Sequence, residues 1–328
     1  MFKKTLKQLK YLLLLIVILI CLPHSILPRQ TTDVSKSDLD YYSRLNDAEH
    51  RLEEYKDDEE TLKLKLIQLN VINKSRSKFK ADDVKLDILA SRVANKMCKD
   101  AADNNFISHW NMKGEKPYHR YAFAGGKDHV TENAFGEWTT SSYSNTSATI
   151  SEKMKNGHNS FMSERAPADG HKKTIIDKPH NFVGIGYYLS DKQFRYYEEF
   201  IDRYFEFGNV ASRLRINEEG RIIFKNDGKY FPYYMVVYRE DFPKPLSLAQ
   251  LKKKGSYADF TEEEYLRMTA WEIASYKKGS EYSVPVKFKK EGLYYIQIFA
   301  DKKEITKPEN LDTKGKTPAS GIVIRVEN

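Results

Sequence analysis

Histidines and carboxylates that could do chemistry lie in the irregular middle of the sequence, among stretches rich in Asn, Gly and Ser. The candidates are His109, His119, His129, Glu132, His158, Glu164, His171 and His180. Neutral imidazoles and carboxylates are natural ligands of divalent transition ions, and a carboxylate beside a histidine favours an electrostatic or acid–base role. The sequence has no G-x-S-x-G elbow and no H-E-x-x-H helix. Metal binding or acid–base chemistry is therefore favoured over a nucleophile.

The stretch "DGHKKTIIDKPHNFVGIGYYL" (169–189) combines two histidines with Gly184-x-Gly186. A phosphate-binding loop needs a glycine-rich turn that opens into a helix. Here the glycines lie within a strand-like run that is followed by a turn and more strand. They predict a sheet face on which a neighbour packs closely. His171 is the site candidate, and His180 is expected to be a turn residue.

Apolar spacing predicts the elements that position these residues. Helical periodicity marks residues 62–79, 85–102 and 149–164, and the spacing of Leu45, Ala48, Leu52 and Tyr55 predicts a short stalk or packing helix within residues 31–61. Residues 182–190 and 194–205 flank "DKQ" and predict a β-hairpin. Five strand-like runs separated by Gly, Pro, Asp and Lys predict a β-sandwich over residues 208–328.

The net charge of +8 is largely local, because residues 1–30 hold five basic side chains and no acid. "MFKKTLKQLK" followed by "YLLLLIVILICL" is typical of a secretory signal or a single signal anchor. We expect an exported protein, in the cell envelope or outside the cell, with a membrane contact only through residues 1–30. The mixed charges of the remainder argue against a nucleic-acid partner. Cys21 and Cys98 are the two cysteines, so no disulfide framework is expected.

Residues 62–206 resemble the CAP superfamily (cysteine-rich secretory, antigen 5 and pathogenesis-related type 1 proteins, SCP-like) in its bacterial, cysteine-poor form. The resemblance rests on an ordered series of segments. These are "LNVINKSR", "LDILASRVANKM", "SHW", "KPYHRYAFAGG", "TENAFGE", "GHKKTIIDKPHNFVGIGYY" and "EEFIDRYF". The implied fold class is α+β, an α-β-α sandwich over residues 62–207 followed by the smaller all-β region of residues 208–328.

The resemblance also implies a groove lined by two histidines and two acidic residues. His109 and His171 match the histidines, and Glu132 matches one acid. Glu164 is the expected second acid, Glu152 the alternative to it, and His158 a further candidate on the same approach. These side chains would hold a divalent metal, with Zn²⁺ the first candidate, and His109, Glu132, Glu164 and His171 are also the candidates for any catalytic role.

Three functions remain open from the sequence. The first is a binding module whose groove holds a metal and a lipid, peptide or glycan ligand. The second is a metal- or tetrad-assisted hydrolase of envelope or extracellular polymers, which the lack of an activated Ser, Cys or Thr disfavours. The third is a structural or adhesion protein. Arg120 is expected to be a structural ion-pair partner or cap, and Asn133 to tie down a loop.

Overall fold

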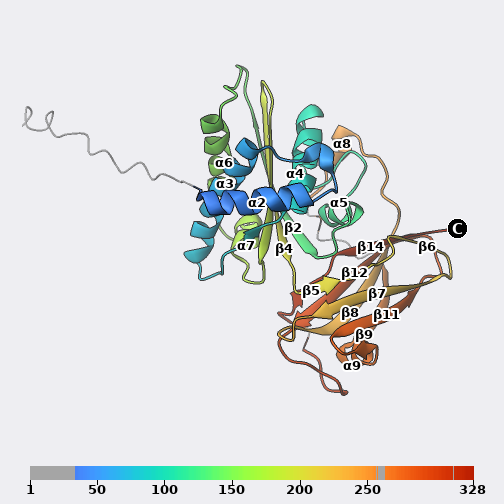
Figure 1. Cartoon of the computed structure of the whole chain (residues 1–328). Helices are drawn as coiled ribbons and strands as arrows, with labels where there is room; N and C mark the ends of the chain where they lie inside the picture. The colour runs from blue at the N-terminus through green and yellow to red at the C-terminus, as the bar shows by residue number, and fades with distance from the viewer. Residues whose placement is uncertain (1–33, 256, 258–262, 313) are drawn as a thin grey trace, which may run out of the picture. The chain divides into compact units, whose positions relative to one another are not determined.

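The computed structural model describes residues 34–255, 257, 263–312 and 314–328 (Figure 1). The expected signal or anchor in residues 1–30 lies outside this part of the chain. The helices are α2 (Lys36–Ala48), the 3-10 turn η1 (Glu53–Tyr55), α3 (Glu59–Ser77), α4 (Ile88–Asp103), α5 (Pro117–Phe123), α6 (Ser147–Ser163), α7 (Gly170–Ile176), α8 (Leu248–Leu251) and α9 (Ala270–Ala274).

The strands form three sheets. The first has the order β1-β3-β4-β2, built from β1 (Lys85–Leu86), β3 (Phe182–Leu189), β4 (Gln193–Asp202) and β2 (His129–Trp138). The second has the order β10-β11-β7-β5, built from β10 (Lys277–Lys278), β11 (Glu281–Lys287), β7 (Glu219–Asn226) and β5 (Phe205–Phe207). The third has the order β6-β14-β12-β8-β9, with β13 (Thr317–Pro318) beside β12; its strands are β6 (Arg213–Arg215), β14 (Ile322–Glu327), β12 (Gly292–Asp301), β8 (Phe231–Glu240) and β9 (Glu263–Thr269).

Helices cover both faces of the first sheet. Helices α3, α6 and α7 lie on one face, and α4 and α5 lie on the other (Figure 1). Asp87 precedes helix α4 as its N-cap, and its carboxylate accepts the N–H of Ala90. Its apolar side packs on β3 and β4, which form the expected antiparallel hairpin. The expected α-β-α sandwich is confirmed.

The two glycines of β3 allow the close packing of α4. A Cβ at Gly184 would lie 2.4 Å from the backbone carbon of Ala90, and a Cβ at Gly186 would lie 2.4 Å from that of Ala94. Real side chains do not approach a backbone so closely. The interpretation of this Gly-x-Gly as a packing feature is therefore correct.

The N-terminal helix packs on the domain rather than forming a stalk. The guanidinium of Arg92, on α4, donates to the backbone carbonyls of Asn46, Glu49 and Arg51. The prediction of a helix that continues from Leu45 to Tyr55 is wrong for its second half, because α2 ends at Ala48. Leu52 adopts a left-handed conformation, with φ of 50°, which an α-helix cannot contain.

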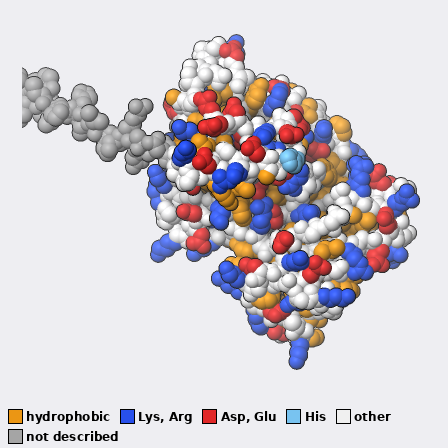
Figure 2. Space-filling view, in the orientation of Figure 1, with side chains coloured by type: hydrophobic (Ala, Val, Ile, Leu, Met, Phe, Trp, Pro, Cys, Tyr) orange, Lys and Arg blue, Asp and Glu red, His pale blue; other side chains and the backbone are white. Residues whose placement is uncertain are grey.

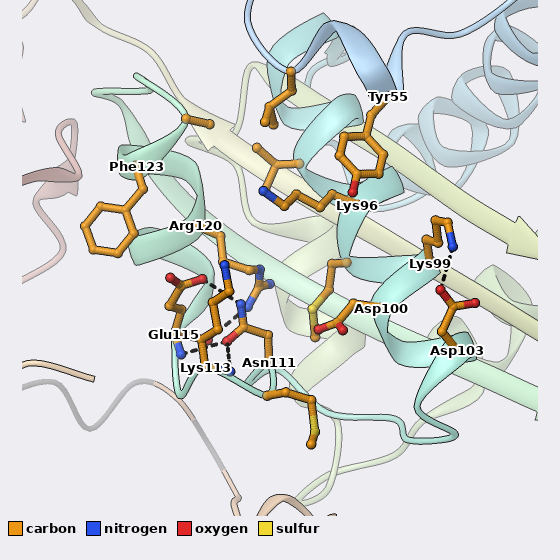
Figure 3. Close-up of a pocket in the computed structure, with 15 residues that line it drawn as sticks. Tyr55, Lys96, Lys99, Asp100, Asp103, Asn111, Lys113, Glu115, Arg120 and Phe123 are labelled. Atoms are coloured by element: carbon orange, nitrogen blue, oxygen red, sulfur yellow. Dashed lines mark hydrogen bonds and ion pairs between the residues drawn. The ribbon is translucent and has the colours of Figure 1, made fainter. Parts of the chain in front are cut away.

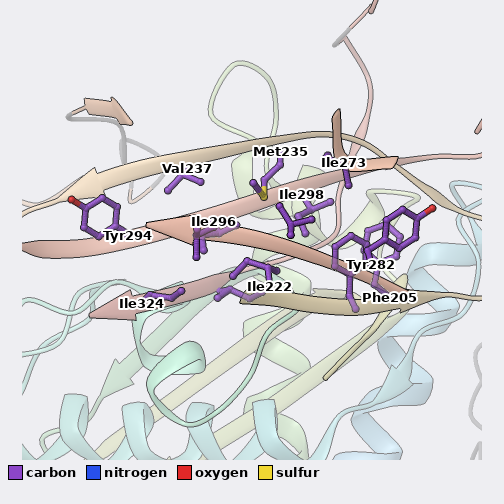
Figure 4. Packing of buried hydrophobic residues seen from close by; sticks show 14 of the residues in the cluster. Phe205, Ile222, Met235, Val237, Ile273, Tyr282, Tyr294, Ile296, Ile298 and Ile324 are labelled. Carbon is purple, nitrogen blue, oxygen red and sulfur yellow. The ribbon is translucent and has the colours of Figure 1, made fainter. Parts of the chain in front are cut away.

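The second and third sheets face each other and form a β-sandwich, as the sequence predicts. Its core contains Ile222, Tyr282, Met235, Ile296 and other buried side chains of both sheets (Figure 4). Because β5 pairs with β7, this sandwich begins a few residues before the expected boundary at 207/208. Another cluster joins Tyr295 and Val323 of the sandwich strands to residues of α4 and α5, and Val34–Asn328 form one compact unit.

Charges of both signs are interspersed over the face shown in Figure 2. This distribution is typical of a solvated surface and not of a phosphate-binding stripe. In residues 34–255, 257, 263–312 and 314–328, no helix is long and apolar enough to span a membrane. Cys98 is buried and unpaired.

Candidate functional site

The first half of the candidate site is built around His109. This residue lies in the loop between α4 and α5, and its Nδ1 is 2.8 Å from Oε1 of Glu132, on β2. Arg120, on α5, forms an ion pair with Oε2 of Glu132 through Nη2, and its Nη1 donates to the backbone carbonyl of His109 at 2.7 Å. Arg120 is thus the ion-pair partner that the sequence predicts. It holds both members of the pair.

The second half of the site is built around His171, the second residue of α7. Its Nδ1 is 2.5 Å from Oε1 of Glu164, which ends α6, and its backbone N–H donates to Oε2 of the same carboxylate at 3.0 Å. Phe161 stacks on the imidazole at a centroid distance of 4.8 Å. Asn133 donates to the backbone carbonyl of His171 and so ties β2 to helix α7, rather than to a loop. Glu164 therefore partners His171, whereas Glu152 is exposed on α6.

The two halves meet in one cavity of about 670 Å³ along the free edge of β2. The imidazole centroids of His109 and His171 are 6.1 Å apart. The cavity is lined by His109, Tyr118, His129, Val130, Thr131, Glu132, Asn133, Glu164, Ala168, Gly170, His171, Thr174, Gly255, Tyr257 and Tyr295. All four expected site residues are in this set, together with residues from the C-terminal third of the chain.

Burial controls the ionisation of the first half of the site. Desolvation, followed by the charge of Arg120, lowers the pKa of His109 to about 4, so the imidazole is neutral at pH 7. Donation from Nδ1–H to Glu132 then leaves Nε2 as an acceptor. Glu199, on β4, lies opposite Glu132 in the sheet, and burial and the charge of Glu132 raise its pKa well above the ordinary value. The neutral form of Glu199 is therefore favoured more than in an exposed glutamate.

The four expected ligands are not arranged as a zinc shell. Glu132 and Glu164 each accept from a histidine Nδ1, the role of carboxylates that orient metal-bound histidines without touching the metal. Glu132 also pairs with Arg120. The nitrogens left for an ion are Nε2 of His109 and Nε2 of His171, fewer than the three or four protein ligands of zinc sites. Within the described ranges, no three His, Cys, Asp or Glu side chains form a group that could hold a metal ion.

Two other histidines of the central region have structural partners. His158 is buried between Glu198 and Ser75, at 2.8 and 2.9 Å, and does not line the cavity. His180 is buried, with Nδ1 2.6 Å from Asp202, so it is a core residue rather than a simple turn residue.

His119 and His129 also have defined surroundings. His119 is buried on α5, with Nε2 3.6 Å from Glu240. His129, one of the candidates named from the sequence, lines the cavity.

Two residues of the site were not found from the sequence. Glu199 follows Glu198 in a strand, and two adjacent acids in a strand must point to opposite faces, which was a usable signal for a buried carboxylate. Tyr257 lies between α8 and β9, and 125 positions separate it from Glu132, its hydrogen-bonding partner. No periodicity or motif marks it.

A second cavity, of about 460 Å³, lies between α4 and α5. Figure 3 shows Arg120 on its wall, with Asp100, Lys96, Lys113 and Glu115 around it. Arg120 therefore separates this cavity from the site, because the same guanidinium pairs with Glu132. The charges around this second cavity have both signs and do not select a ligand.

Residues 69–201 match the family model described as the cysteine-rich secretory protein family, CAP. This part of the chain is a CAP domain. The match includes all four expected site residues, and the order of elements in the structure is the one that the resemblance implies. Comparison with curated proteins gave no match.

Two solved structures are similar to a part of this chain. An outer surface protein from Borrelia burgdorferi is 15% identical, with 43% of this chain and 92% of that chain covered and a TM-score of 0.34. An extracellular protein containing a SCP domain from Bacillus anthracis is 21% identical, with 43% of each chain covered and a TM-score of 0.31. At these TM-scores neither likeness supports a functional assignment. The assignment of the CAP domain rests on the family model.

Proposed function

We propose that this CAP-domain protein is exported and binds a ligand in the cavity between its two His–Glu pairs. The carrying observation is that His109–Glu132 and His171–Glu164 come from different helices and loops and open into one cavity of about 670 Å³. The basic and apolar N-terminal sequence supports export. A lipid, a peptide and a glycan are the ligand classes considered from the sequence.

Binding is favoured over hydrolysis by the partners of the two imidazoles. In the part of the chain that the structure describes, neither His109 nor His171 is hydrogen-bonded to a Ser, Thr or Cys side chain. The cavity residue Thr131 lies instead beside His180, at 3.4 Å, and burial raises the pKa of Cys98 well above its ordinary value. A histidine without a nucleophile beside it can orient and bind a ligand, but it does not activate a side chain for attack.

A divalent ion is the first small ligand to test. It would be held by Nε2 of His109 and of His171, with Glu132 and Glu164 orienting the rings, and a bound ligand or water would complete its shell. Because two protein nitrogens are few, we expect weak binding that depends on both histidines.

The test is calorimetric titration of residues 31–328 with Zn²⁺, beside His109→Ala and His171→Ala. The expected result is one saturable site that is lost in both variants. Heat that persists in both variants would show that the ion binds elsewhere. If the intact protein gives no heat, it does not bind Zn²⁺, and the metal part of the proposal is wrong.

Hydrolysis is tested on the same three proteins with labelled casein and with cell-wall polymer, with and without Zn²⁺. We expect all three proteins to release no more product than buffer does. Product release by the intact protein that both substitutions abolish would overturn the binding proposal in favour of a hydrolase.

A further inference from the structure

The side-chain amide of Asn133 is held in one orientation. Its Nδ2 donates to the backbone carbonyl of His171 at 3.1 Å and to Oε2 of Glu198 at 3.2 Å. Both partners are acceptors, so a flipped amide would place its oxygen against two other oxygens. The hydrogen bonds therefore assign the nitrogen to the side of Glu198 and α7, and the carbonyl oxygen Oδ1 to the other side.

Glu198 holds this orientation from a position outside the cavity. It lies opposite Asn133 in the pairing of β2 with β4, its side chain is fully buried, and it does not line the cavity. Its other oxygen, Oε1, accepts from the hydroxyl of Tyr196 at 2.6 Å and lies 2.8 Å from Nδ1 of His158. Groups of β4 and α6 thus fix the carboxylate, which presents Oε2 to the amide of Asn133.

The oxygen Oδ1 of Asn133 is an acceptor without a donor. Asn133 lines the cavity and is fully buried, and within the described ranges no group donates a hydrogen bond to its Oδ1. Buried acceptors are nearly always paired in folded proteins, because an unpaired one has lost the hydrogen bonds that water gave it. In the wall of a cavity, a ligand can supply the missing donor.

Two further groups of the cavity wall accept hydrogen bonds. His109 presents Nε2 as an acceptor, because its Nδ1 faces Glu132, and Glu164 contributes a carboxylate. The backbone N–H of Glu132 is a donor at the edge of β2, but it already donates to the hydroxyl of Tyr257 at 2.6 Å. A ligand that complements this wall must therefore bring donors of its own.

We propose that Asn133 determines the ligand class of the cavity: its Oδ1 accepts a hydroxyl of a glycan, and Glu198 is the positioning residue that keeps Oδ1 available. This inference rests on the proposed ligand-binding function and names the ligand. A glycan carries hydroxyls on neighbouring carbons, and each of them can donate to one group and accept from another.

The other two ligand classes complement these groups less well. An acyl chain has no donor, and the carboxylate of a fatty acid adds a further acceptor to a wall of acceptors. Each backbone N–H of a peptide is accompanied by a carbonyl that needs a donor, and the backbone N–H of Glu132 is occupied.

The experiment exposes residues 31–328 to an array of neutral glycans and then measures the affinity for the strongest binder by calorimetry. The proteins are the wild type, Asn133→Ala and Asn145→Ala; Asn145 is exposed, lies before α6 and does not line the cavity. We expect Asn133→Ala to bind about tenfold more weakly than the wild type, because a hydroxyl of the ligand stays unpaired, and Asn145→Ala to bind as the wild type does. Equal affinity of Asn133→Ala and the wild type, or no glycan bound on the array, would overturn the proposal.

A second variant and a spectroscopic measurement distinguish this role from a contribution to folding. Glu198→Gln keeps the shape of the side chain but can donate as well as accept, so the amide of Asn133 is no longer held in one orientation. We expect about threefold weaker glycan binding by this variant. In the wild type, the ¹³C NMR signal of the Asn133 side-chain carbonyl should shift when the glycan saturates the protein. An unchanged signal at saturation would contradict the hydrogen bond to Oδ1.

Zn²⁺ titration of the same proteins separates the two proposals. Zinc binding by a protein that binds no glycan removes this inference alone, and the absence of both removes the proposed function as well. Palmitate binding that Asn133→Ala weakens, in place of glycan binding, would assign a lipid and overturn the glycan.

Discussion

At the scale of single residues, Arg120 determines the state of the His109–Glu132 pair. Its guanidinium neutralises a carboxylate that is otherwise surrounded by buried groups, and it also holds the backbone of His109. Removal of one member of a buried ion pair leaves the other charge without compensation. Without Arg120, both the imidazole of His109 and the carboxylate of Glu132 that accepts from it would lose their fixed orientation.

We therefore expect Arg120→Gln to lower the free energy of unfolding by about 3–5 kcal/mol. The double variant Arg120→Gln with Glu132→Gln should be more stable than the sum of the single losses predicts, because neither charge remains buried. Urea denaturation of the four proteins of this cycle measures both quantities. Strict additivity would show that Arg120 and Glu132 are not coupled.

The second residue-scale prediction concerns His129. Burial, with a smaller contribution from His180, lowers the pKa of His129 from 6.5 to about 4. Between these two pH values the unfolded chain takes up a proton that the folded chain does not, so stability is lost as the pH falls. His129→Gln should reduce this slope by at most about 1.4 kcal/mol per pH unit. Denaturation curves from pH 7 to pH 4 test the slope, and an NMR titration midpoint near 6.5 for His129 would contradict the cause.

The site residues were predictable from the sequence to different degrees. His109, Glu132 and His171 followed from the resemblance to the CAP superfamily, and Glu164 was expected as the second acid; the structure brings all four to one cavity. Their role in binding a metal or another ligand stays a prediction. Tyr257 was not predictable, because a single aromatic residue in a polar segment gives no periodic or motif signal. Its position depends on tertiary packing alone.

At the scale of elements, the contact between α4 and β3 decides how tightly the helix packs on the sheet. Gly184 and Gly186 are spaced two apart on one face of β3, opposite Ala90 and Ala94 on α4. Two residues along a strand and one turn along a helix cover similar distances, so each glycine of β3 faces one alanine of α4. The neighbours that a side chain would meet are backbone atoms of α4 and the Cβ atoms of Ala90 and Ala94, which cannot rotate away.

Gly184→Ala and Gly186→Ala should each destabilise the protein by about 1–3 kcal/mol, the usual cost of overpacking a core. Gly170→Ala is the matched control, since a Cβ added at Gly170 would meet no atom within 4 Å and this residue begins α7. Thermal unfolding followed by circular dichroism compares the three variants. Equal stability of Gly184→Ala and Gly170→Ala would mean that α4 moves away from the sheet at little cost.

Element boundaries show where sequence reasoning failed. The β3–β4 hairpin and helices α3 and α4 followed from periodicity, because their buried faces extend over many residues. The helix expected through Tyr55 ends early, since the carbonyls after Asn46 bind the guanidinium of Arg92 instead of continuing the helix. That competing partner is distant in the sequence, and the local spacing of apolar residues contains no information about it.

At the scale of the whole molecule, Glu240 connects the CAP domain to the sandwich. Its carboxylate, at the end of β8, accepts from Lys116 Nζ at 2.7 Å and from the Tyr118 hydroxyl at 2.6 Å. Lys116 and Glu240 are both buried. The connection is therefore a desolvated charge contact, whose loss costs far more than that of a surface pair.

Glu240→Gln should lower the free energy of unfolding by about 3 kcal/mol, because the substitution removes the buried negative charge that lies 2.7 Å from Lys116 Nζ. Glu281→Gln is the control: its contact with Lys225 is 3.8 Å long and both side chains are about half exposed, so a change within about 0.5 kcal/mol is expected. Urea denaturation measures both. Equal effects of the two substitutions would show that the two parts of the chain are held together mainly by their apolar contacts.

The free edge of β2 has a consequence for solubility. An unpaired strand edge can join the same edge of another molecule, which is a common route to aggregation. Here Tyr257 covers Glu132, and the N–H of Gly321 donates to the carbonyl of Lys127, just before β2 begins. Both covering residues belong to the C-terminal third. A fragment without this third would lose both contacts, so we expect it to self-associate more readily than the whole chain does.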